Sequence, residues 1–258
     1  MDAFWIVVAG VLGLAIGSFL TVVVDRVPEH RSIVSPGSRC PGCGQEIRAR
    51  DNIPVISYVL LRGRCRACGE PISIRYPILE ALTALIFGAT AAAHHAPYVV
   101  VMLCALDAVL IAVSAIDIER RIIPNAITYP ATVAFAVAVV LGWIGGVGLS
   151  PVQGVIGLLG YGGVFLLIAV ISRGMGMGDV KLAALIGLVL GSVGLRYVAA
   201  AAGVAVLLGG LGGLLALAIG RGRKSTIPFG PYLAAGALVA IVFAQPISDW
   251  YLRTFVPA

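Results

Sequence analysis

Two long apolar runs meet at the hexapeptide Gly176-Met177-Gly178-Asp179-Val180-Lys181. Its acidic residue is therefore expected at or near a membrane boundary. Gly174, Gly176 and Gly178 leave the backbone room to approach another segment closely and to adopt positive φ angles. Asp179 follows them at a position suited to the N-cap of a helix, and a capping role alone would also explain this residue.

A second acidic residue ends another apolar run, in Ser114-Ala115-Ile116-Asp117-Ile118-Glu119-Arg120-Arg121. If the two runs pack side by side, two carboxylates meet at the edge of the membrane, as an aspartyl protease requires. Glu80 and Asp107 also fall inside apolar runs. Asp107 would lie about 80° round the helix from Asp117 and about 15 Å along it, so it is not the expected partner. The alternative for any one of these acids is a boundary residue solvated by lipid headgroups.

The composition is that of a polytopic membrane protein. The chain has 258 residues, of which 60% are hydrophobic and only 12% are charged, whereas about 25% are charged in soluble domains. Its mean hydropathy is +1.03. The net charge of +6 comes from basic residues in the loops between apolar runs, so no nucleic acid is expected as a partner.

Eight apolar runs are candidates for membrane-spanning helices. They cover roughly residues 4–24, 78–95, 98–116, 126–145, 152–172, 180–195, 197–219 and 228–247. A helix satisfies its own backbone hydrogen bonds in lipid, so the expected class is an all-α polytopic membrane protein with about eight transmembrane helices.

The distribution of basic residues predicts the topology. No basic segment precedes the first run, which indicates a retained span with the N-terminus outside. With that orientation, 16 of the 18 Lys and Arg residues fall in inner loops, and only Arg196 and Arg253 fall outside. Asp117, Asp179 and the first loop are then on the cytoplasmic side.

That first loop, at about residues 25–77, contains a cysteine pattern typical of a metal site. Cys40-Pro41-Gly42-Cys43 and Cys65-Arg66-Ala67-Cys68 are separated by 21 residues, and each is followed by glycine, at Gly44 and Gly69. Two such knuckles favour a tetrahedral zinc ion with four cysteine ligands. Four thiolates leave no open position, so the zinc would be structural. Two disulfides or free thiols are the alternative, and disulfides are rare in the cytoplasm.

Taken together, these motifs resemble those of bacterial type IV prepilin peptidases. Asp117 with Ile122-Ile123-Pro124-Asn125, and the Gly-x-Gly-Asp of residues 176–179, are similar to the two active-site motifs of that family. The further matching segments are Gly17-Ser18-Phe19-Leu20, Arg26-Val27-Pro28, Ser38-Arg39-Cys40-Pro41, Asp51-Asn52-Ile53-Pro54, Leu61-Arg62-Gly63-Arg64-Cys65-Arg66-Ala67-Cys68, Arg75-Tyr76-Pro77 and Ile227-Pro228-Phe229-Gly230-Pro231. The resemblance covers almost the whole chain.

The resemblance implies an aspartyl endopeptidase of the bacterial cytoplasmic (inner) membrane with Asp117 and Asp179 as its catalytic residues. Members of that family remove the short basic leader of prepilins and pseudopilins, after a glycine, for type IV pili and type II secretion. Members with the cysteine loop also N-methylate the new N-terminus, using S-adenosylmethionine. Thr21, Asp25 and Asn125 depart from the residues common in the family. The chain has no Gly-rich dinucleotide-type signature, so the residues that bind S-adenosylmethionine are not identified by sequence.

The expected organisation has three parts. Residues 1–24 form the first transmembrane helix, residues 25–77 the cytoplasmic zinc-binding loop domain, and residues 78–258 the membrane peptidase domain. Two alternatives to the bifunctional enzyme are a peptidase without methyltransferase activity and a non-catalytic transporter that uses its acids for proton coupling. A transporter would be expected to carry those acids near the middle of the bilayer.

Overall fold

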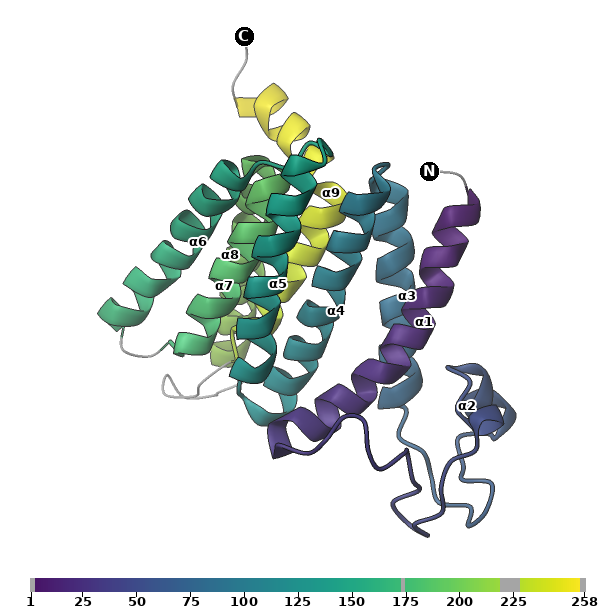
Figure 1. Cartoon of the computed structure of the whole chain (residues 1–258). Coiled ribbons are helices and arrows are strands. Elements are labelled where there is room, and N and C mark those ends of the chain that lie inside the picture. Colours follow the sequence, from purple (N-terminus) through teal and green to yellow (C-terminus); the bar gives the residue numbers. More distant parts are fainter. Residues whose placement is uncertain (1–2, 173–174, 219–227, 256–258) are drawn as a thin grey trace. The chain divides into compact units, whose positions relative to one another are not determined.

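Helices account for nearly all of the regular structure. The computed structural model describes residues 3–172, 175–218 and 228–255, and within these ranges it contains no β-strand (Figure 1). The α-helices are α1 (Ala3–Arg26), α2 (Ile56–Leu60), α3 (Arg75–Ala93), α4 (Pro97–Arg120), α5 (Asn125–Ile144), α6 (Pro151–Ser172), α7 (Met177–Val193), α8 (Leu195–Ala218) and α9 (Gly230–Phe255). Two short 3-10 helices are η1 (Val27–Glu29) and η2 (Ala49–Asp51). The predicted all-α class is confirmed.

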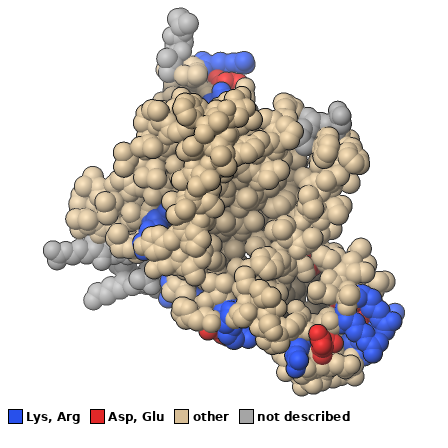
Figure 2. Space-filling model, viewed as in Figure 1, with Lys and Arg blue, Asp and Glu red and all other residues tan. Residues whose placement is uncertain are grey.

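Seven of the described helices are long and apolar enough to cross a membrane: α1, α3, α4, α5, α6, α8 and α9. The eighth predicted span, at about residues 180–195, corresponds to α7, which has 17 residues. Figure 2 shows charged side chains gathered over the cysteine loop and near helix ends, while the sides of the helices are largely uncharged. The protein is therefore a multi-pass membrane protein.

The chain folds as two compact units, Met1–Ala92 and Ala93–Ala258. Unit 1 contains α1, the cysteine loop with α2, and α3. In this unit α1 lies close against α3, because a Cβ atom added at Gly17 would come within 2.7 Å of the Glu80 Cα atom. α3 begins at Arg75, and Pro77 is its third residue, where the missing N–H costs no helical hydrogen bond.

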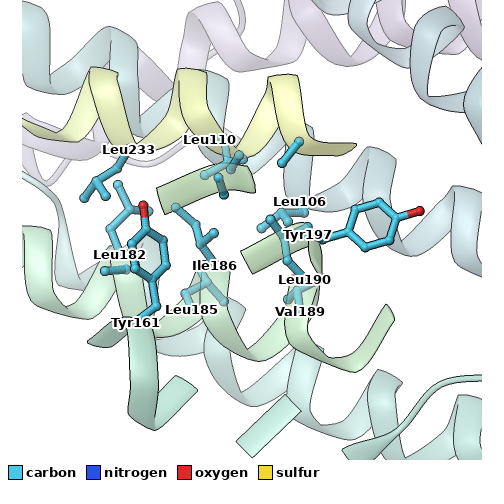
Figure 3. Packing of buried hydrophobic residues seen from close by; sticks show 14 of the residues in the cluster. Leu106, Leu110, Tyr161, Leu182, Leu185, Ile186, Val189, Leu190, Tyr197 and Leu233 are labelled. Atoms are coloured by element: carbon cyan, nitrogen blue, oxygen red, sulfur yellow. The ribbon is translucent and has the colours of Figure 1, made fainter. Parts of the chain in front are cut away.

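Unit 2 is built around α7, which packs against α5, α6, α8 and α9. Leu182, Leu185, Ile186 and Leu190 of α7 are completely buried, and Figure 3 shows them between residues of α4, α6 and α9. Such a helix is shielded from lipid by protein, so it tolerates being shorter than its neighbours.

The backbones of α6 and α7 touch. A Cβ atom added at Gly157 would lie 2.1 Å from the carbonyl oxygen of Gly187, and one added at Gly187 would lie 2.2 Å from the carbonyl oxygen of Gly157. Any side chain at either position would force the helices apart. Small residues at membrane-helix interfaces permit this close approach, and here it holds the central helix in register with α6.

Candidate functional site

Asp117 lies in the last turn of α4. The helix ends where Arg121 adopts a left-handed conformation with φ 55°, and the Arg121 N–H donates a hydrogen bond to the Asp117 carbonyl oxygen at 2.9 Å. The chain then runs through Ile123 to Pro124, which is extended and precedes α5. Asp117 itself is only 5% exposed, so its carboxylate is directed into unit 2 rather than into solvent.

Asp179 lies in the first turn of α7, but it is not the N-cap. The N-cap is Gly176, with extended backbone angles, and Asp179 is the third residue of the helix. The expectation of an N-cap at Asp179 is therefore wrong, because Met177 and Gly178 already belong to the helix. The Asp179 carboxylate reaches back and accepts a hydrogen bond from the N–H of Gly176, as the third residue of a capping box does.

Three chain segments converge at these two aspartates. Ile123, between α4 and α5, packs against Gly178: a Cβ atom added at Gly178 would lie 2.8 Å from the Ile123 Cβ atom. Gly230, the first residue of α9, lies against Asp117, since an added Cβ atom would be 2.6 Å from the Asp117 Oδ2 atom. Asp117 and Asp179 are close enough to interact electrostatically. The predicted side-by-side placement of the two acids is thus present at one end of unit 2.

The interior of unit 2 contains buried polar atoms without hydrogen-bond partners. Among the described residues, the Asp117 Oδ2 atom, the Ser114 Oγ atom and the Tyr161 hydroxyl are buried and have no hydrogen-bond partner. Ser114 is one helical turn before Asp117. Because buried polar atoms are normally hydrogen-bonded, the unpaired oxygen of Asp117 is available to a water molecule or to a polar substrate group.

Lys181 is two residues after Asp179 in the sequence, but its ammonium group contacts residues of α5. Its Nζ atom donates a hydrogen bond to the Asn125 Oδ1 atom at 2.9 Å and lies 4.8 Å from the centre of the Tyr129 ring. The charge is therefore held against α5. These contacts connect the Gly-x-Gly-Asp segment to the start of α5, which follows Asp117 in the chain. The sequence contains both motifs, but it does not indicate that Lys181 contacts Asn125 and Tyr129.

The four patterned cysteines form one cluster in unit 1. The sulfur atoms of Cys40, Cys43, Cys65 and Cys68 all lie within 4.8 Å of one another and are not bonded as disulfides. The Sγ atoms of Cys40 and Cys68 are 3.7 Å apart, against about 3.8 Å for the edge of a tetrahedron with zinc–sulfur bonds of about 2.3 Å. The cluster can therefore hold a metal ion.

The two knuckles that supply these sulfurs have the same backbone design. Gly44 donates its N–H to the Cys40 carbonyl oxygen at 2.9 Å, and Gly69 donates its N–H to the Cys65 carbonyl oxygen at 3.0 Å. Both glycines have positive φ, at 71° and 75°, which explains the residue type at these positions. The N–H groups of Cys68 and Ala67 lower the pKa of the Cys65 thiol to about 7, which favours the thiolate that a metal requires.

The remaining acids have other surroundings. Glu80 is buried in α3, and its Oε2 atom accepts a hydrogen bond from the Val55 N–H at 2.7 Å. Asp107 is completely buried in α4. Gly174 and Ile227, which belong to the two glycine-containing motifs of unit 2, lie outside the described residues.

Fold and site define a polytopic membrane protein with a paired-aspartate centre in unit 2 and a four-cysteine cluster in unit 1. Residues 11–94 match the family model described as Bacterial Peptidase A24 N-terminal domain, and residues 104–214 match the Type IV leader peptidase family. The chain belongs to the type IV leader peptidase family.

Curated relatives match over nearly the whole chain. A prepilin leader peptidase/N-methyltransferase from Bacillus subtilis is 34% identical, covering 94% of this chain and 96% of the relative. Proteins of the same name from Aeromonas hydrophila and Neisseria gonorrhoeae are each 33% identical; the matches cover 94% and 97% of this chain and 92% and 94% of those relatives. No solved structure matches the chain significantly.

Proposed function

We propose that this protein cleaves the leader peptide of type IV prepilins and pseudopilins and N-methylates the new N-terminal residue. The relatives that match nearly the whole chain are named for both reactions. The peptidase assignment depends on one observation: the buried Asp117 and the half-buried Asp179 lie close together although their helices are far apart in the sequence.

Asp117 and Asp179 divide the proton transfers of peptide hydrolysis between them. One carboxylate takes a proton from the attacking water while the other, as the neutral acid, donates a proton to the scissile carbonyl oxygen. Asp179 is better placed to carry the negative charge, because it lies at the N-terminus of α7 and accepts the Gly176 N–H. Asp117 also accepts a backbone N–H, that of Gly230, but it lies in the last turn of α4, where the helix dipole favours the neutral acid. We therefore assign the base to Asp179 and the acid to Asp117.

The orientation follows from the loops. The protein lies in the bacterial inner membrane with its N-terminus outside, because this orientation places nearly all Lys and Arg in cytoplasmic loops. The two aspartates and the cysteine loop then face the cytoplasm, where prepilin leaders are exposed. The short basic leader of a prepilin is removed on that side.

A structural zinc ion in the four-cysteine cluster stabilises the loop. Cys40, Cys43, Cys65 and Cys68 supply four soft ligands with the spacing of a tetrahedron. Since all four positions are filled by protein, the ion has no site for a reacting water. S-adenosylmethionine, when bound, supplies the methyl group for the amine that cleavage exposes.

The paired aspartates favour this function over a proton-coupled transporter. Both acids lie in the terminal turns of their helices rather than at mid-helix, whereas transporter sites lie near the bilayer midplane. A peptidase that lacks methyl transfer is the remaining alternative, and it would leave the new amine unmodified.

The decisive experiment mixes the purified full-length protein with a prepilin and S-adenosylmethionine and follows the product by mass spectrometry. We expect loss of the leader after a glycine and a gain of one methyl group on the mature N-terminus. An intact prepilin would contradict the peptidase assignment, and a cleaved but unmethylated product would identify the peptidase-only alternative.

Replacing Gly230 by alanine is expected to reduce cleavage by about 10²-fold, the cost of displacing a catalytic group by roughly 1 Å. The new Cβ atom would fall 2.6 Å from the Asp117 Oδ2 atom and 3.2 Å from the Ile123 Cδ1 atom, so the carboxylate has to move. Gly163→Ala is the matched control, since nothing lies within 4 Å of its added Cβ atom. The measurement is kcat for leader removal; equal rates for the two variants would contradict the placement of Asp117.

A further inference from the structure

Unit 1 contains a cavity that the peptidase reaction does not use. Its volume is ≈ 720 Å³, and sites for small molecules usually have about 300–1,000 Å³. It lies between the C-terminal part of α1, the cysteine loop and the start of α3, with Thr21, Val55 and Glu80 among its walls. All of its lining residues belong to unit 1.

A separate groove of ≈ 340 Å³ in unit 2 is lined by Val239, Phe243, Pro246, Ile247 and Trp250. That groove has only apolar side chains and proline on its walls, so it offers nothing to a polar ligand.

The walls of the unit 1 cavity carry both signs of charge. Five arginines and five carboxylates line it, together with the rings of Tyr58 and Tyr76. Several of these charges are already neutralised: Arg66 pairs with Asp51 at 2.7 Å, and Asp25 pairs with Arg75 and accepts a hydrogen bond from the Tyr76 hydroxyl. Such a lining suits a ligand that itself carries both positive and negative groups.

Glu80 differs from the other carboxylates of the cavity. It is 8% exposed, and its one hydrogen bond among the described residues is the one from the Val55 N–H at 2.7 Å. No Lys or Arg of the described residues forms an ion pair with it. A buried carboxylate without a countercharge is costly, and a cationic ligand in the cavity would supply that charge.

The segment that Glu80 holds is strained. Val55 has φ 60° and ψ −47°, and the Ile56 N–H donates to the Pro54 carbonyl oxygen at 2.6 Å across a three-residue turn. Positive φ is unfavourable for a β-branched residue, and this form of the γ-turn is rare. Strain of this kind persists where the surroundings enforce it, and it is concentrated at ligand sites. Here Glu80 enforces it at the wall of the cavity.

We propose that this cavity binds S-adenosylmethionine, with the Glu80 carboxylate facing the positively charged end of the molecule. The ligand combines a sulfonium, an ammonium, a carboxylate and a planar base. The cavity offers an unpaired carboxylate for the cations, arginines for the carboxylate and tyrosine rings for the base. This inference rests on the methyl-transfer part of the proposed function.

The cavity also adjoins the metal cluster. Cys40 and Cys65 are among its lining residues, so the knuckles shape one wall of it. Loss of the metal would then deform the binding site for the methyl donor without any direct contact between the metal and that molecule.

The test is binding of S-adenosylmethionine to the full-length protein in detergent, measured by isothermal titration calorimetry. Glu80→Gln retains an oxygen that can accept the Val55 N–H but removes the charge, and we expect its affinity to fall about tenfold to a hundredfold, as for a lost interaction with a charged group. Ser38 lines the same cavity, and the larger side chain in Ser38→Trp would fill part of it, so this variant should also bind S-adenosylmethionine more weakly. Asp249→Asn is the matched control, because Asp249 is an exposed acid of α9 in unit 2 and is not among the residues that line the cavity.

Each outcome decides the assignment. Wild-type affinity in both Glu80→Gln and Ser38→Trp, with methyl transfer present in the wild type, would overturn the site and leave the proposed function intact. A wild-type protein that neither binds S-adenosylmethionine nor methylates a cleaved prepilin would contradict the methyltransferase function and this site together. An equal loss of affinity in Asp249→Asn would show that the effect is not specific to the cavity, and it would also overturn the site.

Discussion

Asp117→Asn and Asp179→Asn are each expected to abolish leader cleavage, with a loss of about 10²–10⁴-fold or more in kcat, because each change removes one of two proton transfers in the same step. The double variant should be no slower than either single variant, since residues that act as a unit are not additive. Asparagine has nearly the shape of aspartate, so the packing of Ile123, Gly178 and Gly230 should be retained.

The measurement is the rate of conversion of a prepilin to its mature form by purified variants. Glu119→Gln is a suitable control, because Glu119 is an exposed acid only two residues from Asp117. Substantial cleavage by either single aspartate variant would rule out the pair as the catalytic centre. A comparable loss in Glu119→Gln would show that the effect of the substitutions is not confined to the paired acids.

Cys40→Ser is expected to remove the metal from the purified protein. The wild type should contain one zinc ion per chain by elemental analysis, and the variant should contain much less. Structural zinc contributes an apparent binding free energy of about 10–16 kcal/mol in small domains near pH 7, so the loop should also become sensitive to limited proteolysis. Methyl transfer should fall more than leader cleavage, because the cluster belongs to unit 1 and the aspartates to unit 2.

Cys104→Ser provides the control for that experiment. Cys104 is a buried cysteine of α4 that forms no disulfide and is not part of the cluster, so this variant should keep its zinc. Wild-type protein without metal, with a loop that resists proteolysis, would contradict the structural role of zinc. Equal zinc contents in Cys40→Ser and wild type would contradict the ligand assignment.

The helices could be predicted closely from the sequence because apolar runs of this length have few alternatives in lipid. The largest difference is at the C-terminus, where the predicted span ends at about residue 247 and α9 continues to Phe255. The prediction followed hydropathy, which falls at Ser248 and Asp249, but a helix can continue beyond the apolar layer. Pro246 lies inside α9 and does not end it.

The aspartates and cysteines were identifiable because their motifs are local, whereas the contacts that position them are not. The approach of Gly230 to Asp117 and the bond between Glu80 and Val55 join residues that are distant in the chain. The hydrophobic periodicity of a sequence does not show which distant residues come into contact. The N-cap expectation for Asp179 failed for a related reason: capping preferences do not determine which of several successive residues begins the helix.

The burial of α7 has a consequence for the order of synthesis. The helix is short, and its partners include α8 and α9, which leave the ribosome after it. It cannot be fully enclosed until those helices have entered the membrane. Gly230, which lies against Asp117, is the first residue of α9. A nascent chain without α9 lacks this contact with Asp117, and we therefore expect proteolytic activity only after α9 has been synthesised.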